Sequence, residues 1–400
     1  MGGPGGYLYN IQQYLKEHTN YSEISFASDL LLTNDISQKI PQTSSLKSFL
    51  FNWYQSKKNN KTYRPIIKII RFCDALRDFY TKKNKLPINI KKLAEFDAIH
   101  FHSTIHMGQI MHLLDGYNGK IVLTTHCPEP YSIEILEGLF NNKILINLIK
   151  PIFLKKEIEG WKNADRFLFP VQESVEVYFK CSALKKYYYK NKKNFYYCPS
   201  SISTEVELKN IPIKQQLGIP DNSFVVSYVG RHNTVKGYDQ LKIFANSILN
   251  KYDNVHFVIA GIQTPLVELS HPKWHELGQI NYVADLLNQS DVFVLPNRET
   301  YFDLVTLEVL RIGTPLLLTN TGGNRYFHTL PPDETSGMVF YEYGNLDSQI
   351  AAFESLYTIL SKEKADRIRT TNRALFNKYF STEKFIKRYI KVMNEIINSH

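Results

Sequence analysis

A strand, a glycine turn and a helix follow one another after Phe224, and this succession restricts the fold more than any other feature of the chain. The run FVVSYV, Phe224 to Val229, is continuously apolar, as expected of a strand buried on both faces. Gly230 marks a turn, and an amphipathic segment that predicts a helix begins near Gly237. The loop between strand and helix carries two cations.

The same succession returns further along the chain. DVFVL, Asp291 to Leu295, predicts a second strand, and a polar loop separates it from a helix over Leu304 to Ile312. Gly313 fits the residue that ends this helix, and Pro315 to Thr319 predicts the next strand. Strands that alternate with helices predict an α/β fold with parallel sheets.

The first half of the chain shows a looser version of this pattern. Strands are expected at Phe96 to Ser103, Gly119 to His126 and Arg166 to Val171, and helix is expected across Tyr131 to Glu159. After Gly344 the chain is expected to be helical to its end.

The segments from Val225 to Gly323 resemble the retaining family 4 glycosyltransferases of the GT-B fold, the glycosyl transferases group 1. Members carry a GR…KG loop and a pair of glutamates around a helix that ends in a GxP turn, and the chain has GRHNTVKG and LEVLRIGTP in that order. The resemblance implies two Rossmann-like domains that face each other across a cleft, with a C-terminal helix that crosses back to the first domain.

Three segments are expected on this basis. Residues 1–200 would form the acceptor-binding domain, residues 201–378 the domain that binds the nucleotide sugar, and residues 379–400 the returning helix, with Thr382 to Asn398 as its candidate. The turn-rich stretch from Pro199 to Ser203 is the expected boundary.

Cations beyond a strand end suit the leaving group of such a reaction. Breaking a bond between sugar and diphosphate places negative charge on phosphate oxygens, which preorganised donors must stabilise. Gly230, Arg231 and Lys236 follow a predicted strand at its carboxyl end, where open α/β sheets bind ligands. Arg231 offers a planar fork and Lys236 a point charge. The alternative is that both are solvated loop cations.

A glutamate lies within the apolar helix LVTLEVLRI. The resemblance implies that Glu308 holds the ribose hydroxyls and that the first helical turn, at Leu304, faces the donor. A carboxylate in apolar surroundings needs a partner. The alternative is a glutamate that complements the helix dipole or pairs with Arg311.

The first glutamate of the pair is displaced. Eight residues separate Glu299 from Glu308 where the family has seven, so Thr300 occupies the regular position. Asp303 stands where the family has glycine, and an acid there caps the helix but competes with a phosphate. Two interpretations remain open: the loop bulges so that Glu299 reaches the sugar, or the donor contacts are altered.

The amino-terminal glycines match the family's glycine-rich loop, in which backbone approaches the diphosphate before a helix. Gly5 and Gly6 are the best positional matches, although no predicted strand precedes them, and a flexible tail is the alternative.

His126 in LTTHCPEP matches a family histidine beside the transferred sugar, where it would act in hydrogen bonding or proton transfer; a packed or capping histidine is the alternative. His102 and His106 have no carboxylate cluster nearby, and no DxD motif occurs, so neither a metal nor a cofactor is expected.

The positive charge is concentrated in the first half of the chain. Residues 1–200 hold 28 Lys and Arg against 17 Asp and Glu, whereas the remainder hold 20 against 21. The excess gathers at Lys57 to Lys92 and at Lys180 to Lys193, where cations alternate with aromatic residues. This pattern suits an anionic membrane surface, and the helix predicted over Arg64 to Tyr80 has an apolar side for it; a core-facing helix is the alternative. No nucleic-acid motif accompanies the charge.

These features together predict an enzyme that moves a sugar from a UDP- or GDP-sugar to a glycan or lipid-linked acceptor with retention, in bacterial surface polysaccharide biosynthesis. Four scattered cysteines without CxxC spacing and the lack of a membrane-length apolar run favour a cytoplasmic protein, peripheral at the inner face of the membrane. The alternatives are a non-catalytic nucleotide-sugar binder, an inverting or epimerising enzyme on the same fold, and an interaction scaffold.

Overall fold

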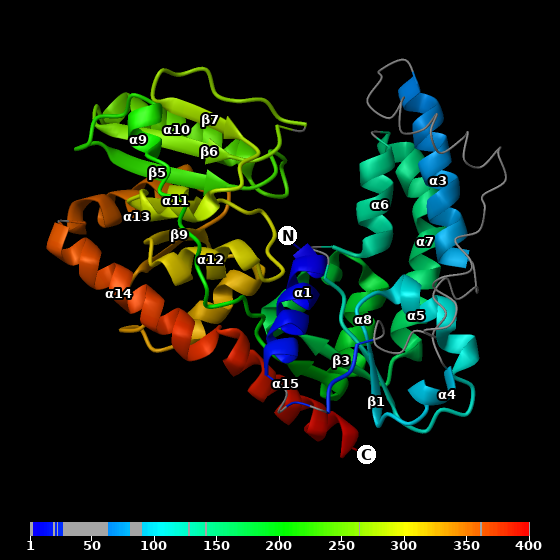
Figure 1. Ribbon diagram of the computed structural model, residues 1–400. Coiled ribbons are helices and arrows are strands. Elements are labelled where there is room, and N and C mark those ends of the chain that lie inside the picture. Colours follow the sequence, from blue (N-terminus) through cyan, green and yellow to red (C-terminus); the bar gives the residue numbers. More distant parts are fainter. Residues whose placement is uncertain are drawn as a thin grey trace. The chain divides into compact units, whose positions relative to one another are not determined.

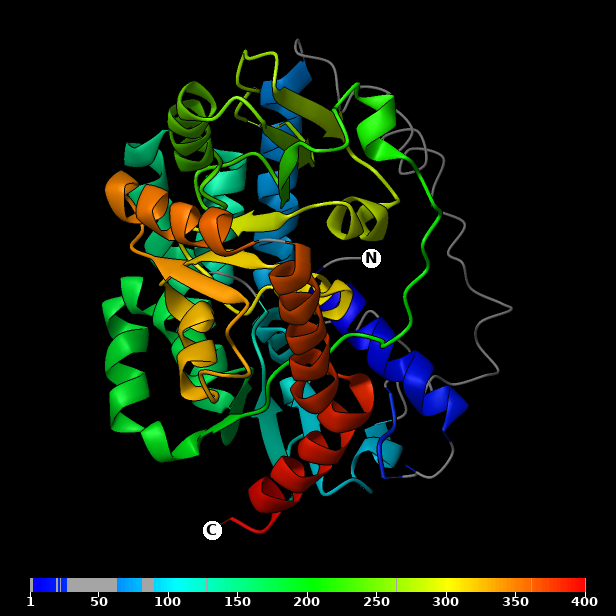
Figure 2. The ribbon, with the colours of Figure 1, turned by 90° about the vertical axis from the view of Figure 1, so that its left-hand side faces the viewer.

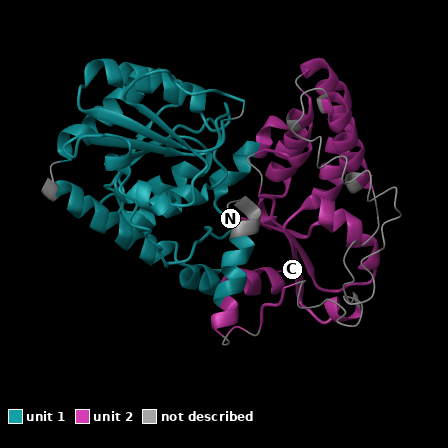
Figure 3. Cartoon of the chain, turned by 45° about the horizontal axis from the view of Figure 1, so that its top comes forward, with its two compact units in different colours: residues 1–14, 170–177, 197–390 teal, residues 15–169, 178–196, 391–400 magenta. Residues whose placement is uncertain are grey.

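A computed structural model describes residues 3–18, 21, 23–26, 63–80, 90–126, 129–140, 142–263, 265–360 and 362–399. The chain forms two compact units (Figures 1 and 3). Unit 1 comprises residues 1–14, 170–177 and 197–390, and unit 2 comprises residues 15–169, 178–196 and 391–400. The three-segment division expected from the sequence stays a prediction.

Unit 2 is built on a four-stranded sheet in the order β1-β2-β3-β4. Its strands are β1 (Ala98–Phe101), β2 (Lys120–Leu123), β3 (Arg166–Phe169) and β4 (Phe195–Tyr197). β2 pairs in parallel with β1 and with β3. The strands are shorter than the runs predicted from sequence, so His126 lies three residues beyond β2 rather than at its end.

The helices of unit 2 are α3 (Arg64–Tyr80), α4 (Ile90–Leu93), α5 (Thr104–Ile110), η3 (Met111–Leu113), α6 (Tyr131–Leu139), α7 (Lys143–Asn163), α8 (Ser182–Lys190) and η5 (Lys192–Asn194). The single helical stretch expected over Tyr131 to Glu159 is therefore two helices. The break has a local cause, because the Asn142 side chain accepts hydrogen bonds from the backbone N–H groups of Ile144 and Leu145 and so starts α7 anew.

Unit 1 is built on a six-stranded parallel sheet in the order β10-β9-β8-β5-β6-β7. Its strands are β5 (Phe224–Val229), β6 (Val255–Ala260), β7 (Trp274–Gly278), β8 (Val292–Leu295), β9 (Leu316–Thr319) and β10 (Met338–Tyr341). Every residue of β8 and β9 is buried, which explains why these strands read as continuous apolar runs.

Helices pack against both faces of this sheet (Figures 1 and 2). The helices of unit 1 are α1 (Gly3–Glu17), η4 (Gln172–Lys180), α9 (Ile213–Gln216), α10 (Tyr238–Lys251), α11 (Val283–Asn288), α12 (Leu304–Ile312), η6 (Gly322–Thr329), α13 (Leu346–Ile359), α14 (Lys362–Tyr379) and α15 (Thr382–Ile397). One core joins α10 and α13 to the sheet, and a smaller one joins α9 and α11 to its other face. The chain passes from one unit to the other at residue 391 within α15, and near the ends of α1, η4 and β4.

The chain is thus α/β with two parallel sheets of Rossmann-like type and C-terminal helices, as predicted. The strands and helices expected between Phe224 and Thr319 are confirmed to within about one residue. The helix predicted over Arg64 to Tyr80 is confirmed as α3.

Candidate active site

The topology of the unit 1 sheet places two loops side by side. The chain runs from β5 outward through β6 and β7, then returns to form β8 on the other side of β5. The strand order therefore reverses between β5 and β8, which pair with each other in parallel. Ligands of open α/β sheets bind beyond the carboxyl ends of the strands at such a reversal. The two loops singled out in the sequence begin at these two ends.

The loop after β5 is held by backbone contacts. The Tyr228 hydroxyl donates to the Arg231 carbonyl at 2.9 Å, and a Cβ added to Gly230 would lie 2.6 Å from that hydroxyl. The Arg298 N–H, which belongs to the loop after β8, donates to the Val235 carbonyl at 3.0 Å. Arg231 has an exposed side chain above this fixed backbone. The guanidinium therefore has access to an anion in solution.

Gly237 brings the start of α10 against the end of β8. Its φ of +65° lies in the left-handed region, and a Cβ at this position would lie 1.7 Å from the Pro296 carbonyl oxygen. A residue other than glycine cannot make this approach. Gly237 therefore sets the separation between the two loops, and with it the position of Lys236.

Lys236 and Asp303 form an ion pair between the two loops. Lys236 Nζ lies 2.5 Å from Asp303 Oδ1, and the two side chains are 19% and 18% exposed. The Asn297 side-chain amide donates to the other Asp303 oxygen. Asp303 occupies the N-cap position of α12, but its side chain makes no capping hydrogen bond.

The expectation that Asp303 caps α12 is therefore wrong, because its carboxylate is held by Lys236 and Asn297 instead. Since no side chain caps the helix, the backbone N–H groups of its first turn, at Leu304, remain available to an anion. The charge of Asp303 is balanced by Lys236, which reduces the competition with a phosphate that the sequence suggested.

Glu308 lies one turn into α12 and is partly buried. Burial raises the pKa of its carboxyl, and the nearby positive charge of Arg311 opposes that shift. The Arg311 guanidinium donates to the carbonyls of Ser203 and Glu205 at 2.8 and 2.7 Å. Within the described residues, no cation lies within ion-pair distance of Glu308. Pairing with Arg311, the alternative to a ribose-binding role, is thus a longer-range interaction.

Glu299 and Thr300 have different environments. Thr300 is fully buried, and its carbonyl accepts a hydrogen bond from the Gly323 N–H at 2.9 Å. A Cβ added to Gly322 would lie 2.1 Å from that carbonyl, so the TGG turn clamps the backbone of Thr300. The Glu299 side chain is 18% exposed, and its Oε1 lies 4.0 Å from Arg298 Nε. Of the two residues, Glu299 has the accessible functional group.

Gly5 and Gly6 lie in the first turns of α1 and not in a loop before it. The expected loop is therefore wrong at these positions, because the helix already begins at Gly3. Neither glycine shares a described contact with the β5 or β8 loops. Their role at a diphosphate stays a prediction.

In unit 2, three histidines follow or end strands at one edge of the sheet. His102 Nδ1 and His126 Nε2 are hydrogen-bonded at 2.8 Å, and the two rings stack with centroids 5.1 Å apart. His100 Nε2 lies 2.7 Å from the Thr124 hydroxyl, which donates to the Leu168 carbonyl. Because that hydroxyl donates its proton elsewhere, it accepts from His100. His126 is thus part of a pair and not an isolated capping residue.

Burial lowers the pKa of all three imidazoles. It lowers the pKa of His126 to about 4 and that of His100 to about 3, and the pKa of His102 lies well below its ordinary value. The neighbouring histidines add to the burial effect at His100 and His102. The pair His102–His126 is therefore neutral at pH 7, with one ring donating and the other accepting.

This cluster predicts a dependence of stability on pH. The unfolded histidines titrate near pH 6.5, so unfolding takes up protons below that pH, and the free energy of unfolding should fall as the pH drops from about 6.5 towards 4. In His126→Asn, urea denaturation across this range should show a smaller fall than in wild type. His112→Asn, at an exposed position of unit 2, serves as the control. Equal slopes in His126→Asn and wild type would contradict the assignment.

Comparison with known proteins places the site in a family. The family model described as "Glycosyl transferases group 1" matches residues 223–358, which contain both loops of the site. Residues 223–358 therefore belong to the glycosyl transferases group 1. Two curated relatives are the O-antigen biosynthesis glycosyltransferase WclY of Escherichia coli, 20% identical over 215 residues, and the uncharacterized glycosyltransferase MJ1607 of Methanocaldococcus jannaschii, 29% identical over 125 residues.

These matches cover 51% and 29% of the chain and 56% and 32% of the respective relatives. The match thus spans at most about half the length of either relative. Two solved structures share the fold. The catalytic domain of starch synthase IV from Arabidopsis thaliana, bound to ADP and acarbose, has a TM-score of 0.59 at 15% identity and covers 78% of this chain and 75% of its own. Anabaena Alr3699/HepE in complex with UDP has a TM-score of 0.56 at 15% identity, with coverages of 76% and 80%. The fold matches GT-B structures.

Two residues of this candidate site were not singled out in the sequence. Asn297 is fully buried and donates to Asp303; its signal was a polar residue two positions after a buried strand. His232, between Arg231 and Lys236, is fully buried and stacks on Tyr238 with ring centroids 3.9 Å apart. Burial lowers the pKa of His232 to about 4. Its place between two glycines in a loop gave no sign in the sequence that this histidine would be buried.

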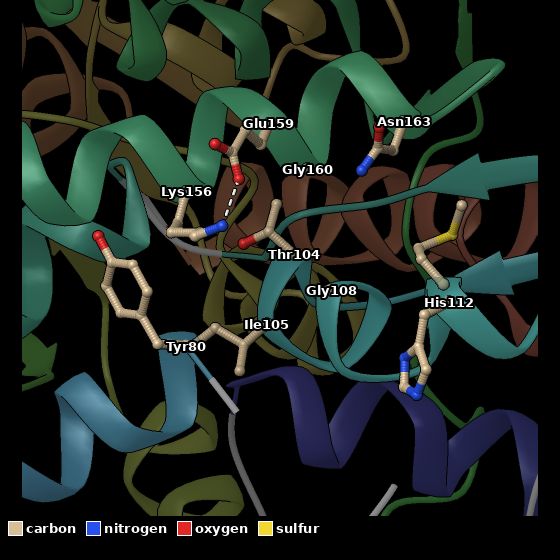
Figure 4. A pocket seen from close by; sticks show the side chains of 10 residues that line it. Tyr80, Thr104, Ile105, Gly108, His112, Lys156, Glu159, Gly160 and Asn163 are labelled. Carbon is tan, nitrogen blue, oxygen red and sulfur yellow. Dashed lines mark hydrogen bonds and ion pairs between the residues drawn. The ribbon is translucent and has the colours of Figure 1, made fainter. Parts of the chain in front are cut away.

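A pocket of about 260 Å³ lies elsewhere, in unit 2 between α3, α5 and α7 (Figure 4). Tyr80, Thr104 and His112 line it, together with the ion pair between Lys156 and Glu159 at 2.6 Å. The predicted site residues are absent from its described lining. Across the described chain, no group of three or more His, Cys, Asp or Glu could hold a metal ion. The expectation of a metal-free site stays a prediction.

Proposed function

We propose that this chain transfers a sugar from a nucleotide-diphosphate donor to a glycan or a lipid-linked acceptor with retention of anomeric configuration. The observation that carries the proposal is the position of Lys236 and of the uncapped start of α12 at the strand-order reversal between β5 and β8. A cation and free helix N–H groups at such a point suit a diphosphate.

Each residue of the site has a proposed role. Arg231 and Lys236 would stabilise the charge that develops on the leaving diphosphate, aided by the first turn of α12 at Leu304, so that no metal ion is needed. Glu308 would accept hydrogen bonds from the ribose hydroxyls, and Glu299 would contact the transferred sugar. Glu308 is partly enclosed, and burial raises the pKa of its carboxyl. The hydroxyl groups of a bound ribose would supply the hydrogen bonds that such a carboxylate needs.

Retention requires the acceptor oxygen to bond to the anomeric carbon on the face from which the diphosphate leaves. The acceptor hydroxyl loses its proton to the departing phosphate oxygen as that bond forms, so no separate base is required. The neutral His102–His126 pair would hydrogen-bond to substrate without carrying charge into the reaction. NMR analysis of the product anomer tests retention: an inverted product would exclude this course.

The names of similar proteins suggest the probes. UDP occupies the HepE structure, and the Escherichia coli relative is named for O-antigen biosynthesis. We therefore propose UDP-sugars as the first donors to test and surface polysaccharide assembly as the setting. The described free cysteines, Cys73, Cys181 and Cys198, form no disulfide, as is usual at the cytoplasmic side of a membrane.

Thermal unfolding in the presence of UDP-glucose, other UDP-sugars and GDP-sugars tests the donor site. A donor at about 100 times its Kd should stabilise the wild type by about 2.7 kcal/mol. Arg231→Ala and Glu308→Gln should lose most of this shift, because each removes a proposed donor contact. Lys378→Ala, an exposed cation on α14, is the control and should keep it.

The same shift in all four proteins would exclude the proposed pocket. A donor could stabilise the wild type and not the site variants while the wild type transfers sugar to neither an acceptor nor water. That result would indicate a non-catalytic nucleotide-sugar binder. Chelation of divalent cations with EDTA should leave the wild-type shift unchanged, and its loss would exclude the metal-free assignment.

A further inference from the structure

The first ten residues of α7, KILINLIKPI, form an apolar helical segment in which no residue is fully buried. The first buried residue of α7 is Phe153, although the helix begins at Lys143. Ile144 and Leu148 are 73% and 71% exposed, and Ile152 is 48% exposed. Isolated exposed aliphatic residues are common, but a continuous series on one helix face indicates an interaction surface.

The exposed residues follow helical spacing. Ile144, Leu148 and Ile152 are four residues apart, and this stripe continues towards Lys155 and lies opposite the buried Phe153. Further along the helix, a shallow groove of about 370 Å³ is lined by Pro151, Leu154, Lys155, Ile158, Glu159 and Lys162. Aliphatic residues and lysine stems therefore cover the outward side of α7 over most of its length.

Helix α3 packs beside α7 and carries a second set of exposed aliphatic residues. Its Phe72 packs against Phe140 and Phe153, with ring centroids 5.5 and 5.9 Å apart, so α3 lies alongside the hairpin of α6 and α7 (Figure 1). Ile66 and Ile69 of α3 are 48% and 60% exposed. Both helices thus present aliphatic residues near their N-terminal ends.

The charges on these two segments have one sign. Residues 64–73 and 143–156 contain no Asp or Glu, and their cations are Arg64, Lys68, Arg71, Lys143, Lys150, Lys155 and Lys156. The nearest acid along α3, Asp74, pairs with Arg77 at 2.8 Å. Along α7, Glu157 is fully buried and accepts from the Ser132 N–H at 3.0 Å, and Glu159 pairs with Lys156 at 2.6 Å. A partner for this surface must therefore combine negative charge with an apolar interior.

We propose that the N-terminal halves of α3 and α7 bind the surface of an anionic phospholipid bilayer. Lysine and arginine heads would contact the phosphates while the aliphatic stripe enters the headgroup boundary. Among the described residues, no helix is both long enough and apolar enough to cross a membrane, so α7 lies in the plane of the interface. Binding there does not depend on the proposed reaction, although it would hold the enzyme near a lipid-linked acceptor.

The second basic segment of the sequence contributes less than expected. In Lys180 to Lys193, Tyr188 is 3% exposed and the Tyr187 hydroxyl donates to the Trp161 carbonyl at 3.1 Å. These two rings belong to the core of unit 2, which corrects the expectation for them, whereas Tyr189 of the same segment is 60% exposed. Lys185 and Lys186 nevertheless remain exposed, and they provide a charge-matched control.

Cosedimentation of the full chain with vesicles tests the proposal. Wild type should bind vesicles that contain phosphatidylglycerol and should bind pure phosphatidylcholine weakly. Ile144→Ser with Leu148→Ser should abolish binding at low and at high salt, because the aliphatic contact is lost; Ile243→Ser, an exposed residue of α10, should have no effect. Both substituted positions are exposed, so the variants should fold.

Replacement of the lysines separates charge from apolar contact. Lys143→Gln with Lys150→Gln should weaken binding to phosphatidylglycerol vesicles about fivefold per lysine at low salt and less at high salt. Lys185→Gln with Lys186→Gln should bind as wild type does. Wild type that stays in the supernatant, or an Ile144→Ser/Leu148→Ser variant that binds normally, would overturn the proposal.

A second copy of the chain is the other occupant that the test can reveal. If wild type is a dimer that the same serine variant converts to a monomer, and vesicles bind neither, the surface is a dimer interface and the membrane proposal is wrong. Failure of vesicle binding would leave the donor-dependent thermal shift intact, so the two proposals are tested separately.

Discussion

Gly237→Ala should lower the free energy of unfolding by about 3–5 kcal/mol, the range of the most damaging single substitutions. An alanine at a φ of +65° costs about 1–2 kcal/mol in backbone strain alone. Its Cβ would also lie 1.7 Å from the Pro296 carbonyl oxygen, so the end of β8 and the start of α10 must separate. That separation should also displace Lys236 from Asp303.

Gly218→Ala is the matched control for this prediction. Gly218 has a φ of +64°, almost identical to that of Gly237, but a Cβ there would meet no atom within 4 Å. It should therefore cost about 1–2 kcal/mol, the backbone strain alone. Urea denaturation of the full chain, followed by circular dichroism, measures both. Equal losses in the two variants would show that the contact with Pro296 does not determine the packing of the two loops.

Lys236→Ala should lower kcat/KM about 100- to 1000-fold with the donor that stabilises the wild type, if the proposed function is correct. Removal of one preorganised donor to a developing oxyanion has effects of this size. The loss should appear mainly in kcat, because the interaction strengthens as charge moves onto the phosphate. The variant also leaves Asp303 without its cation at the start of α12, which adds repulsion to the lost attraction.

Two variants separate these contributions. Lys242→Ala removes another lysine of α10, whose ammonium group donates to the Val267 carbonyl at 3.1 Å, and it should have little effect. Lys236→Ala combined with Asp303→Ala should recover part of the lost activity, because the unpaired carboxylate is removed with its partner. Release of the nucleotide diphosphate in steady-state assays measures all three. Wild-type kcat/KM in Lys236→Ala would exclude this lysine from the reaction.

The strands of unit 1 could be predicted because burial on both faces leaves a direct mark on their composition. Val292–Leu295 and Leu316–Thr319 are short, continuous apolar runs bounded by polar or glycine-containing turns. Helix α12 was equally clear, since Gly313 at a φ of +99° ends it where the sequence has its GxP turn. Local chemistry determined these elements.

The break between α6 and α7 was harder to predict, because both helices are apolar and the nearby glycine, Gly138, lies inside α6 rather than after its end. It depends on one side chain, Asn142, whose oxygen accepts from the next helical turn. The exposure of Ile144 and Leu148 was equally hard to predict, because an apolar helix face usually packs against the core. Whether a distant part of the chain covers such a face leaves no local signal in the sequence.

By itself, the sequence determined the order of strands and helices, the parallel sheets and the identity of the cations after β5, because periodicity and turn residues act over a few neighbouring positions. Tertiary structure alone decided the partners of the charged groups. Asp303 binds Lys236 and Asn297 rather than the start of its own helix, and Arg311 binds the carbonyls of Ser203 and Glu205 rather than Glu308. Such choices depend on which groups the packed chain brings within about 3 Å, and residues more than sixty positions apart carry no local signal of that proximity.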